Sequence, residues 1–599
     1  MSRKNSAWKR TARTQKQQHF SSAVHADIRR STFNRNSSLK TTFNASYIVP
    51  IYVDEILPGD TMEMTLAHVT RLATPVFPTM DDIRIEFHAW FVPNRIVWDG
   101  WEELNGENKT SAWAPTEPPA LVPTAVMNSN GPANIMQGSI GDYYGIPRGM
   151  SLSNTEISVL PFRGYGLIDR EWYRDQNHQA PRVIETGDVE PTTSEYLPNM
   201  PLFRACKPRD YFTTALPSTQ KGDAQGLSLG QIQLPVGWLP VADRHTGPTY
   251  SPLRTPAGIH GESNINQGIN MATSTTGANA VWINQTGTQN VTGSNSQQGR
   301  GDLFAGVGNS NTGPAGTTPL SASNLWTMAG GSGDGFTSIG SALVSDLRLA
   351  FQLQRLLERD ARGGTRYVEM LKAHFGVEAE DYRLQRPEFL GSHTCILGMN
   401  QVPQTSSTDA TSPQANLSAY GMEVEHVPHL FRKTFVEHGY IHIFAIARQV
   451  KTYQQGIERF WFRRERFDFY YPALAHISEQ PIYNREIYAN DSGANGQDGE
   501  VFGYQEAWAD YRYKPNRTSA GFRSMVGVVD LDRWHYGDVY DGLPILGNDW
   551  IIDNSYENIA RTLAVTSDIQ DQFLADIAFG CRSTRAMPVH SVPGMVDHF

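Results

Sequence analysis

Alternating apolar and polar positions are the clearest pattern in the first quarter of the chain. Between residues 83 and 91, every second side chain is apolar: Ile83, Ile85, Phe87, Ala89 and Phe91. A period of two is typical of a strand with one buried face, and residues 62–66 show the same alternation. Residues 440–447 are apolar on both faces apart from His442, which predicts a strand covered on both sides.

The helical pattern is confined to one region. In residues 341–362 apolar side chains recur at steps of three and four, and Gly363 and Gly364 end the pattern. A second helix is predicted for residues 365–375, closed by Gly376. These two segments predict a helical hairpin at 341–376 in a chain that otherwise consists of strands and turns.

Long irregular segments separate the periodic ones. Residues 98–240 are rich in Pro and Gly, as expected for insertions that lie over a framework. Residues 258–342 consist mainly of Gly, Ser, Thr, Asn and Gln, with four charged residues: Glu262, Arg300, Asp302 and Asp334. This composition fits either a disordered linker or a β-rich projecting loop with tight turns.

Charge is unevenly distributed. The net charge is −10, yet residues 1–40 hold ten basic residues and one acid. A basic arm on an acidic body indicates nucleic-acid contact, and a solvated tail is the alternative. The phosphate-contacting candidates are Arg3, Lys4, Lys9, Arg10, Arg13 and Lys16. Charged residues are 19% of the chain, below the usual ~25%, which is typical of a surface covered by partners or further copies.

Catalytic patterns are weak. Residues 226–230 match G-x-S-x-G, but polar residues precede the serine and a proline-bounded stretch follows it. A nucleophile elbow needs a strand before and a helix after, so catalysis is not predicted there. The sequence contains no phosphate-binding loop, zinc-protease motif or dinucleotide fingerprint.

Metal-binding patterns are equally weak. His438 and His442 would lie ~13 Å apart on a strand, too far to share an ion. His426 and His429 form a possible loop pair near Glu423 and Glu425, but structural histidines are favoured over a ligand set. Residues 491–496 begin like a calcium loop that lacks its final glutamate. The three cysteines are widely spaced, so no metal site, cofactor or disulfide framework is predicted.

Residues 459–471 (RFWFRRERFDFYY) interleave basic and aromatic side chains. Such a segment could stack on and neutralise single-stranded nucleic acid. The favoured interpretation is aromatic packing or a subunit contact, with the cations held in ion pairs.

No apolar run approaches the ~20 residues of a membrane helix, so membrane insertion is not expected. No apolar segment of a secretory signal follows the first residues. Together with the sparse cysteines, this favours synthesis in a reducing cytoplasm.

Seven blocks of the sequence carry a family resemblance. They are 40–47 (KTTFNASY), 50–61 (PIYVDEILPGDT), 91–99 (FVPNRIVWD), 357–367 (LERDARGGTRY), 384–388 (LQRPE), 452–456 (TYQQG) and 502–515 (FGYQEAWADYRYKP). These blocks resemble the major capsid proteins of the Microviridae, gokushovirus branch. They run in family order, which makes the resemblance specific.

The resemblance implies an all-β fold: an eight-stranded antiparallel jelly roll of the viral capsid type, spanning residues 41–599. It also implies a T=1 icosahedral shell around a circular single-stranded DNA genome, assembled in the host bacterial cytoplasm and found in the virion. A large insertion, placed by composition at 200–340, would project outward for host attachment. The basic arm, residues 1–40, would line the interior.

The implied partners are further copies of the chain, the genome, an internal scaffolding protein, a DNA pilot protein and a host surface receptor. The resemblance implies no catalytic activity. Two alternatives come from composition alone: a secreted β-rich carbohydrate-active enzyme, and a free single-stranded-DNA-binding protein.

Overall fold

The computed structural model describes residues 29–107, 121–126, 135–148, 155–189, 194–222, 344–364, 366–378, 380–408, 413–490, 496–524 and 531–590, together with short strands between 241 and 321. The chain divides into two compact units. The first consists of Met1–Lys221 and Glu358–Phe599, and the second of Gly222–Leu357.

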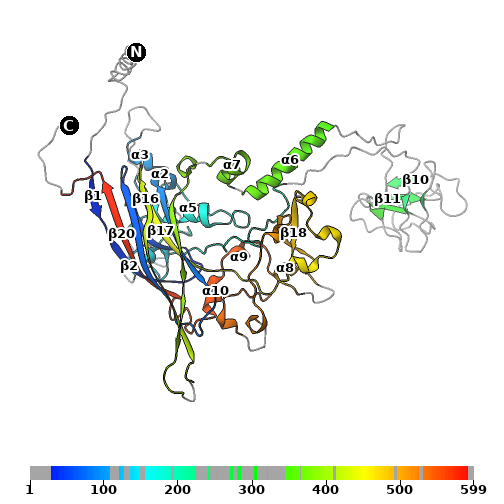
Figure 1. Cartoon of the computed structure of the whole chain (residues 1–599). Coiled ribbons are helices and arrows are strands. Elements are labelled where there is room, and N and C mark those ends of the chain that lie inside the picture. Colours follow the sequence, from blue (N-terminus) through cyan, green and yellow to red (C-terminus); the bar gives the residue numbers. More distant parts are fainter. Residues whose placement is uncertain are drawn as a thin grey trace, which may run out of the picture. The chain divides into compact units, whose positions relative to one another are not determined.

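Two antiparallel sheets form the framework of the first unit (Figure 1). The larger has the order β1-β20-β4-β16-β15, with β2 also paired to β20. Its strands are β1 (Ser31–Asn34), β2 (Ser37–Phe43), β4 (Thr61–Leu72), β15 (Met399–Pro403), β16 (Leu417–Thr434) and β20 (Phe573–Arg585). The smaller has the order β14-β5-β17-β3. Its strands are β3 (Val49–Ile56), β5 (Ile83–Pro93), β14 (Glu388–Leu397) and β17 (Gly439–Gln449).

The core lies between these sheets because their alternating apolar side chains face one another. Met62, Met64 and Leu66 of β4 are fully buried and share one cluster with Ile85 and Phe87 of β5. The predicted strand at 440–447 lies in β17, between β5 and β3, and is almost wholly buried. The all-β antiparallel fold class is therefore confirmed and is consistent with a jelly roll. In the described part of the chain the two sheets hold six and four strands, and the strand count of eight stays a prediction.

The described residues include the end of the basic N-terminal segment. Strands β1 and β2 both pair with β20, so residues 31–43 belong to the larger sheet. Arg35 of this segment forms an ion pair with Asp54 of β3. Residues 1–28 lie outside the described residues.

Short helices and hairpins in the long insertions cover the sandwich. The helices are α2 (Asn94–Val97), α3 (Trp101–Leu104), α4 (Ile140–Tyr143), α5 (Leu160–Ile168), α7 (Tyr367–Phe375), α8 (Asn484–Ile487), α9 (Asn548–Ile551) and α10 (Ser555–Ala560). The hairpins pair β6 (Thr124–Val126) with β7 (Glu156–Ser158), and β18 (Glu479–Tyr483) with β19 (Val501–Glu506). A second, smaller core lies under β18 and β19 and includes Phe212, Ile482 and Trp550.

The segment for which two interpretations were open contains strands. In the second unit β10 (Asn270–Thr273), β11 (Ala280–Asn284), β12 (Leu303–Gly306) and β13 (Leu320–Ser321) form one four-stranded sheet. A further pair joins β8 (Val241–Ala242) to β9 (Pro252–Leu253). These strands favour the β-rich interpretation. Helix α6 (Val344–Gly363) follows, and α6 and α7 occupy the two segments that the apolar pattern predicts to be helical.

Within the described residues, no helix has the length and hydropathy needed to cross a membrane.

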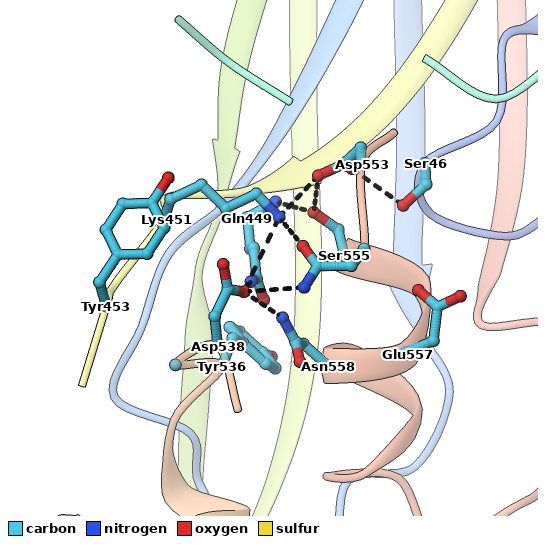
Figure 2. A network of polar contacts seen from close by, with 12 residues as sticks. Ser46, Gln449, Lys451, Tyr453, Tyr536, Asp538, Asp553, Ser555, Glu557 and Asn558 are labelled. Atoms are coloured by element: carbon cyan, nitrogen blue, oxygen red, sulfur yellow. Dashed lines mark hydrogen bonds and ion pairs between the residues drawn. The ribbon is translucent and has the colours of Figure 1, made fainter. Parts of the chain in front are cut away.

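A buried polar network joins distant parts of the first unit (Figure 2). Lys451, just after β17, places its Nζ 2.7 Å from Oδ1 of Asp553 and 2.5 Å from Oδ1 of Asn554. Ser46 donates to the other Asp553 oxygen at 2.9 Å. Although burial alone would raise the pKa of Asp553, Lys451 and Ser555 hold it below its usual value. Asp553 is therefore an ionised, fully buried carboxylate.

The second carboxylate of the network is Asp538. Its Oδ1 accepts from Gln449 at 3.1 Å, Asn554 at 3.2 Å and Asn558 at 2.6 Å. Several donors to one buried oxygen compensate for its lost hydration. The network thus fixes the C-terminal insertion around α10 to the end of β17 and to the chain before β3.

Candidate assembly surface

The six predicted phosphate-contacting residues, Arg3, Lys4, Lys9, Arg10, Arg13 and Lys16, lie outside the described residues. The basic–aromatic segment at 459–471 is described, and it forms a surface of the first unit. Its backbone makes short 3-10 turns at Arg459–Phe462, Arg466–Asp468 and Pro472–Leu474. Turns of this length present successive side chains in different directions, which lets one segment expose many rings.

Large aromatic side chains are exposed along this segment. Trp461 and Phe467 are 68% and 70% exposed. Four more rings are exposed to a lesser degree: Phe460, Phe469, Tyr470 and Tyr471. We call residues 459–471 the aromatic surface. Apolar patches of this kind mark contact sites, because isolated soluble chains bury most of their aromatic area.

Two of the four arginines among these rings are held in ion pairs. Arg463 pairs with Asp510, and Arg459 Nη1 lies 3.6 Å from Glu486 Oε1. Arg463 also stacks on Tyr511, with its guanidinium 4.2 Å from the ring centroid. The ion pairing predicted for this segment is confirmed at these two arginines. The exposed rings indicate a surface that another subunit could cover.

An open cavity of about 610 Å³ lies behind the aromatic surface. Phe460 and Trp461 line one part of it, and the basic side chains Arg512, Lys514 and Arg517 line another. Lys514 pairs with Glu458, whose other oxygen lies 3.5 Å from Arg517. The cavity is therefore lined by aromatic rings together with basic and acidic side chains that are paired with one another.

Helix α6 exposes a second apolar surface. Leu349 and Phe351 are 59% and 61% exposed, and Leu347, Leu353 and Leu356 are also exposed. Ala350, Gln354 and Leu357, which belong to the predicted apolar stripe, are only partly exposed, so the most exposed apolar side chains lie beside that stripe. Tyr367 and Phe375 of α7 are likewise exposed.

The histidine pairs considered as metal ligands do not form sites. His442 is fully buried, with Nδ1 2.8 Å from the Tyr144 hydroxyl, whereas His438 packs against Trp101. His426 and His429 lie in β16, not in a loop as predicted, and both are exposed. The G-x-S-x-G match lies outside the described residues, as does most of the calcium-like motif.

The comparisons with known proteins agree with this architecture. A family model described as "Capsid protein (F protein)" matches residues 21–595. The chain belongs to this phage capsid protein family. It is 38% identical over 605 residues to capsid protein VP1 of Chlamydia phage 1, covering 96% of this chain and 97% of that protein. Capsid protein VP1 of Bdellovibrio phage phiMH2K is 37% identical, with 97% and 98% covered. Capsid protein VP1 of Spiroplasma virus 4 is 37% identical, with 92% and 93% covered.

These relatives confirm the resemblance to the gokushovirus branch of the Microviridae, and the chain is a major capsid protein of this type. By name each relative is a structural component of a virion. The matches support a structural role over an enzymatic one, and they lend nothing to the carbohydrate-active alternative.

Sequence reasoning identified the aromatic surface, because basic and aromatic residues alternate within one segment. It did not predict the exposed apolar side chains of α6, among them Leu349 and Phe351. Periodicity identifies an apolar face, but it does not say whether the same chain or another one covers that face.

Proposed function

We propose that the chain assembles into a T=1 icosahedral shell that encloses circular single-stranded DNA. The observation that carries the proposal is the combination of a sandwich with a complete core and large uncovered apolar surfaces at 459–471 and on α6. The hydrophobic core is formed without these side chains, so they are available for contacts with other molecules. Heterologous contacts that close on themselves would bury them in a shell.

DNA contact is assigned to the N-terminal arm. At the aromatic surface, Arg459 and Arg463 are already engaged by Glu486 and Asp510. Residues 1–40 carry ten bases against one acid. Arg3, Lys4, Lys9, Arg10, Arg13 and Lys16 would contact phosphates on the inner side of the shell without base specificity.

Host attachment is assigned to the insertion at 200–340. It carries few charges, which makes it a poor candidate for holding DNA. The short strands β10–β13 support a β-rich loop whose turns of Gly and small polar residues tolerate change. This insertion would project from the shell and bind a host surface receptor.

Assembly would take place in the cytoplasm of the host bacterium and would involve an internal scaffolding protein and a DNA pilot protein. The family resemblance is the support for these partners. The paired cations and exposed rings of the aromatic surface fit contact with protein rather than with DNA.

The deciding experiment is sedimentation with negative-stain microscopy on material from infected cells. We expect closed isometric particles whose main protein is this chain. Recovery of the chain only as a stable monomer would contradict the proposal. Glycan hydrolysis by such a monomer would revive the carbohydrate-active alternative.

A further inference from the structure

Three potential metal ligands from three strands, His68, Cys395 and Glu425, meet where the two sheets approach each other, and His393 lies beside Glu425. His68 of β4 and Glu425 of β16 are register partners, so their side chains leave the larger sheet on the same face. His393 and Cys395 alternate along β14, the outer strand of the smaller sheet, and therefore also share a face. The ligand atoms of His68, Cys395 and Glu425 all lie within 4.8 Å of one another.

The separation of Cys395 and His68 matches that of two ligands in a tetrahedral site, and His393 reaches the cluster through Glu425. The Cys395 Sγ lies 3.5 Å from the His68 Nε2. Zinc bonds of about 2.3 Å to sulfur and about 2.0 Å to nitrogen, at tetrahedral angles, separate those two atoms by about 3.5 Å. On the other side of the cluster, the His393 Nε2 lies 3.0 Å from the Glu425 Oε1. That nitrogen is buried and makes no hydrogen bond within the described residues, since its close approach to Glu425 is not aligned as one.

A supporting contact orients the first histidine. The His68 Nδ1 lies 3.1 Å from the Thr70 hydroxyl, and the Phe87 ring packs against the imidazole. When Nδ1 donates to Thr70, the lone pair of Nε2 points toward Cys395. Histidines that bind metals are usually held in this way by their other ring nitrogen.

The cluster is closed on one side and open on the other. His68 and Cys395 are buried, whereas the side chains of His393 and Glu425 are 30% and 33% exposed. The open side provides an entry path, and the exposed Glu425 carboxylate has room to rotate toward an ion.

We propose that His68, His393, Cys395 and Glu425 bind one divalent transition-metal ion, with zinc as the best fit. A set of two imidazoles, one thiolate and one carboxylate suits zinc and does not suit calcium or magnesium, which require oxygen ligands. The ion would join β14 of the smaller sheet to β4 and β16 of the larger sheet. It would therefore fasten the two layers of the sandwich at their open edge.

Binding must displace the thiol proton. The Cys395 S–H bond breaks as the metal–sulfur bond forms, and one proton goes to solvent. Zinc affinity should consequently rise with pH across the neutral range.

The test uses the purified full chain, stripped with a chelator and titrated with Co²⁺ as a spectroscopic probe and with Zn²⁺ as a competitor. We expect a thiolate-to-cobalt charge-transfer band that saturates at one ion per chain and disappears when Zn²⁺ is added. Cys395→Ser should abolish the band, and Cys581→Ser, which removes a buried thiol elsewhere, should retain it.

A second variant tests the site in case Cys395→Ser does not fold. Glu425→Gln alters the exposed side of the cluster and should weaken zinc binding by more than about 10-fold in a competition assay, with the fold intact by circular dichroism. The absence of the cobalt band in the wild-type chain, or its persistence in Cys395→Ser, would overturn the proposal. The cluster would then be a hydrogen-bonded core contact in which Cys395 donates to His68.

Discussion

Lys451 and Asp553 form an ion pair inside the protein, with Nζ 2.7 Å from Oδ1 and both side chains almost fully buried. Lys451 follows the central strand β17, and Asp553 precedes α10, so the pair connects the framework to an insertion. A buried pair of this kind contributes little over an apolar contact as long as both partners are present. Its importance appears when one partner is removed.

The first prediction concerns this pair. Asp553→Asn removes the nearer carboxylate of Lys451 and leaves Asp538, 4.0 Å from its Nζ, as the remaining counter-charge. It should lower the free energy of unfolding by roughly 3 kcal/mol, the low end for a broken buried pair. Urea unfolding of the variant measures the loss. The matched control is Lys372→Ala, which breaks the exposed pair with Glu378 and should change the free energy of unfolding far less, because water screens both charges. Equal losses in the two variants would contradict the prediction.

The second prediction concerns acid stability. Burial lowers the pKa of His442 to about 3, and burial, partly opposed by Glu86, lowers that of His88 to about 4. Below the unfolded value of about 6.5, the unfolded chain binds protons that the folded chain excludes. Stability should therefore fall as the pH drops from 6.5 toward 4, by up to about 1.4 kcal/mol per pH unit for each histidine.

Urea unfolding at several pH values measures this slope. His442→Gln and His88→Gln should each reduce it, and His426→Gln should leave it unchanged because His426 is exposed. An unchanged slope in both buried variants would show that other groups govern acid stability.

The third prediction concerns the aromatic surface. Trp461→Ala combined with Phe467→Ala removes its two most exposed rings. Particle yield in sedimentation should fall at least 10-fold, because buried aromatic anchors dominate interfaces. The free energy of unfolding of the unassembled chain should change by less than about 0.5 kcal/mol. Normal particle yield would show that this surface stays exposed in the shell.

The fourth prediction concerns the arm. Six phosphate contacts on single-stranded DNA give a slope of about −4 in a plot of log affinity against log salt concentration. Replacing Arg3, Lys4, Lys9, Arg10, Arg13 and Lys16 by Gln should bring that slope close to zero and reduce DNA retention in particles. If retention and slope stay the same, the arm is only a solvated tail.

The fifth prediction concerns the insertion. Deleting residues 265–335 and rejoining the ends should leave shells intact and abolish adsorption to the host cell. Normal adsorption by the deleted particle would place attachment elsewhere. If no shell forms, the segment is required for contacts between subunits.

Local pattern was enough to predict the framework strands. The alternation at residues 83–91 reports one buried face directly, and β5 spans Ile83–Pro93 as expected. The ends of α6 and α7 were also predictable, since glycines interrupt the apolar repeat. The pairing of β1 and β2 with β20 was not, because pairing partners far apart in sequence leave no periodic signal.

The candidate sites show the same limit. Glu425 was considered beside His426 and His429, its neighbours in sequence. In β16 adjacent side chains point to opposite faces, so Glu425 instead faces His68, the residue opposite it on β4. Ligands that come from three separate strands are far apart in the sequence, so no sequence motif within one segment can reveal them.

The position of β20 also bears on how the chain is made. Phe43 of β2 and Leu72 of β4 both pair with Phe573, so the larger sheet stays open until the final strand has been synthesised. Translation at about 5–20 residues per second leaves β4 without this neighbour for roughly half a minute to two minutes. A strand whose edge is unpaired can pair with a strand of another chain, which leads to aggregation. During this time the unpaired edge of β4 must be protected, either by other parts of the nascent chain in a partly folded intermediate or by a chaperone. We therefore expect aggregation to compete with folding most strongly while the chain is still bound to the ribosome.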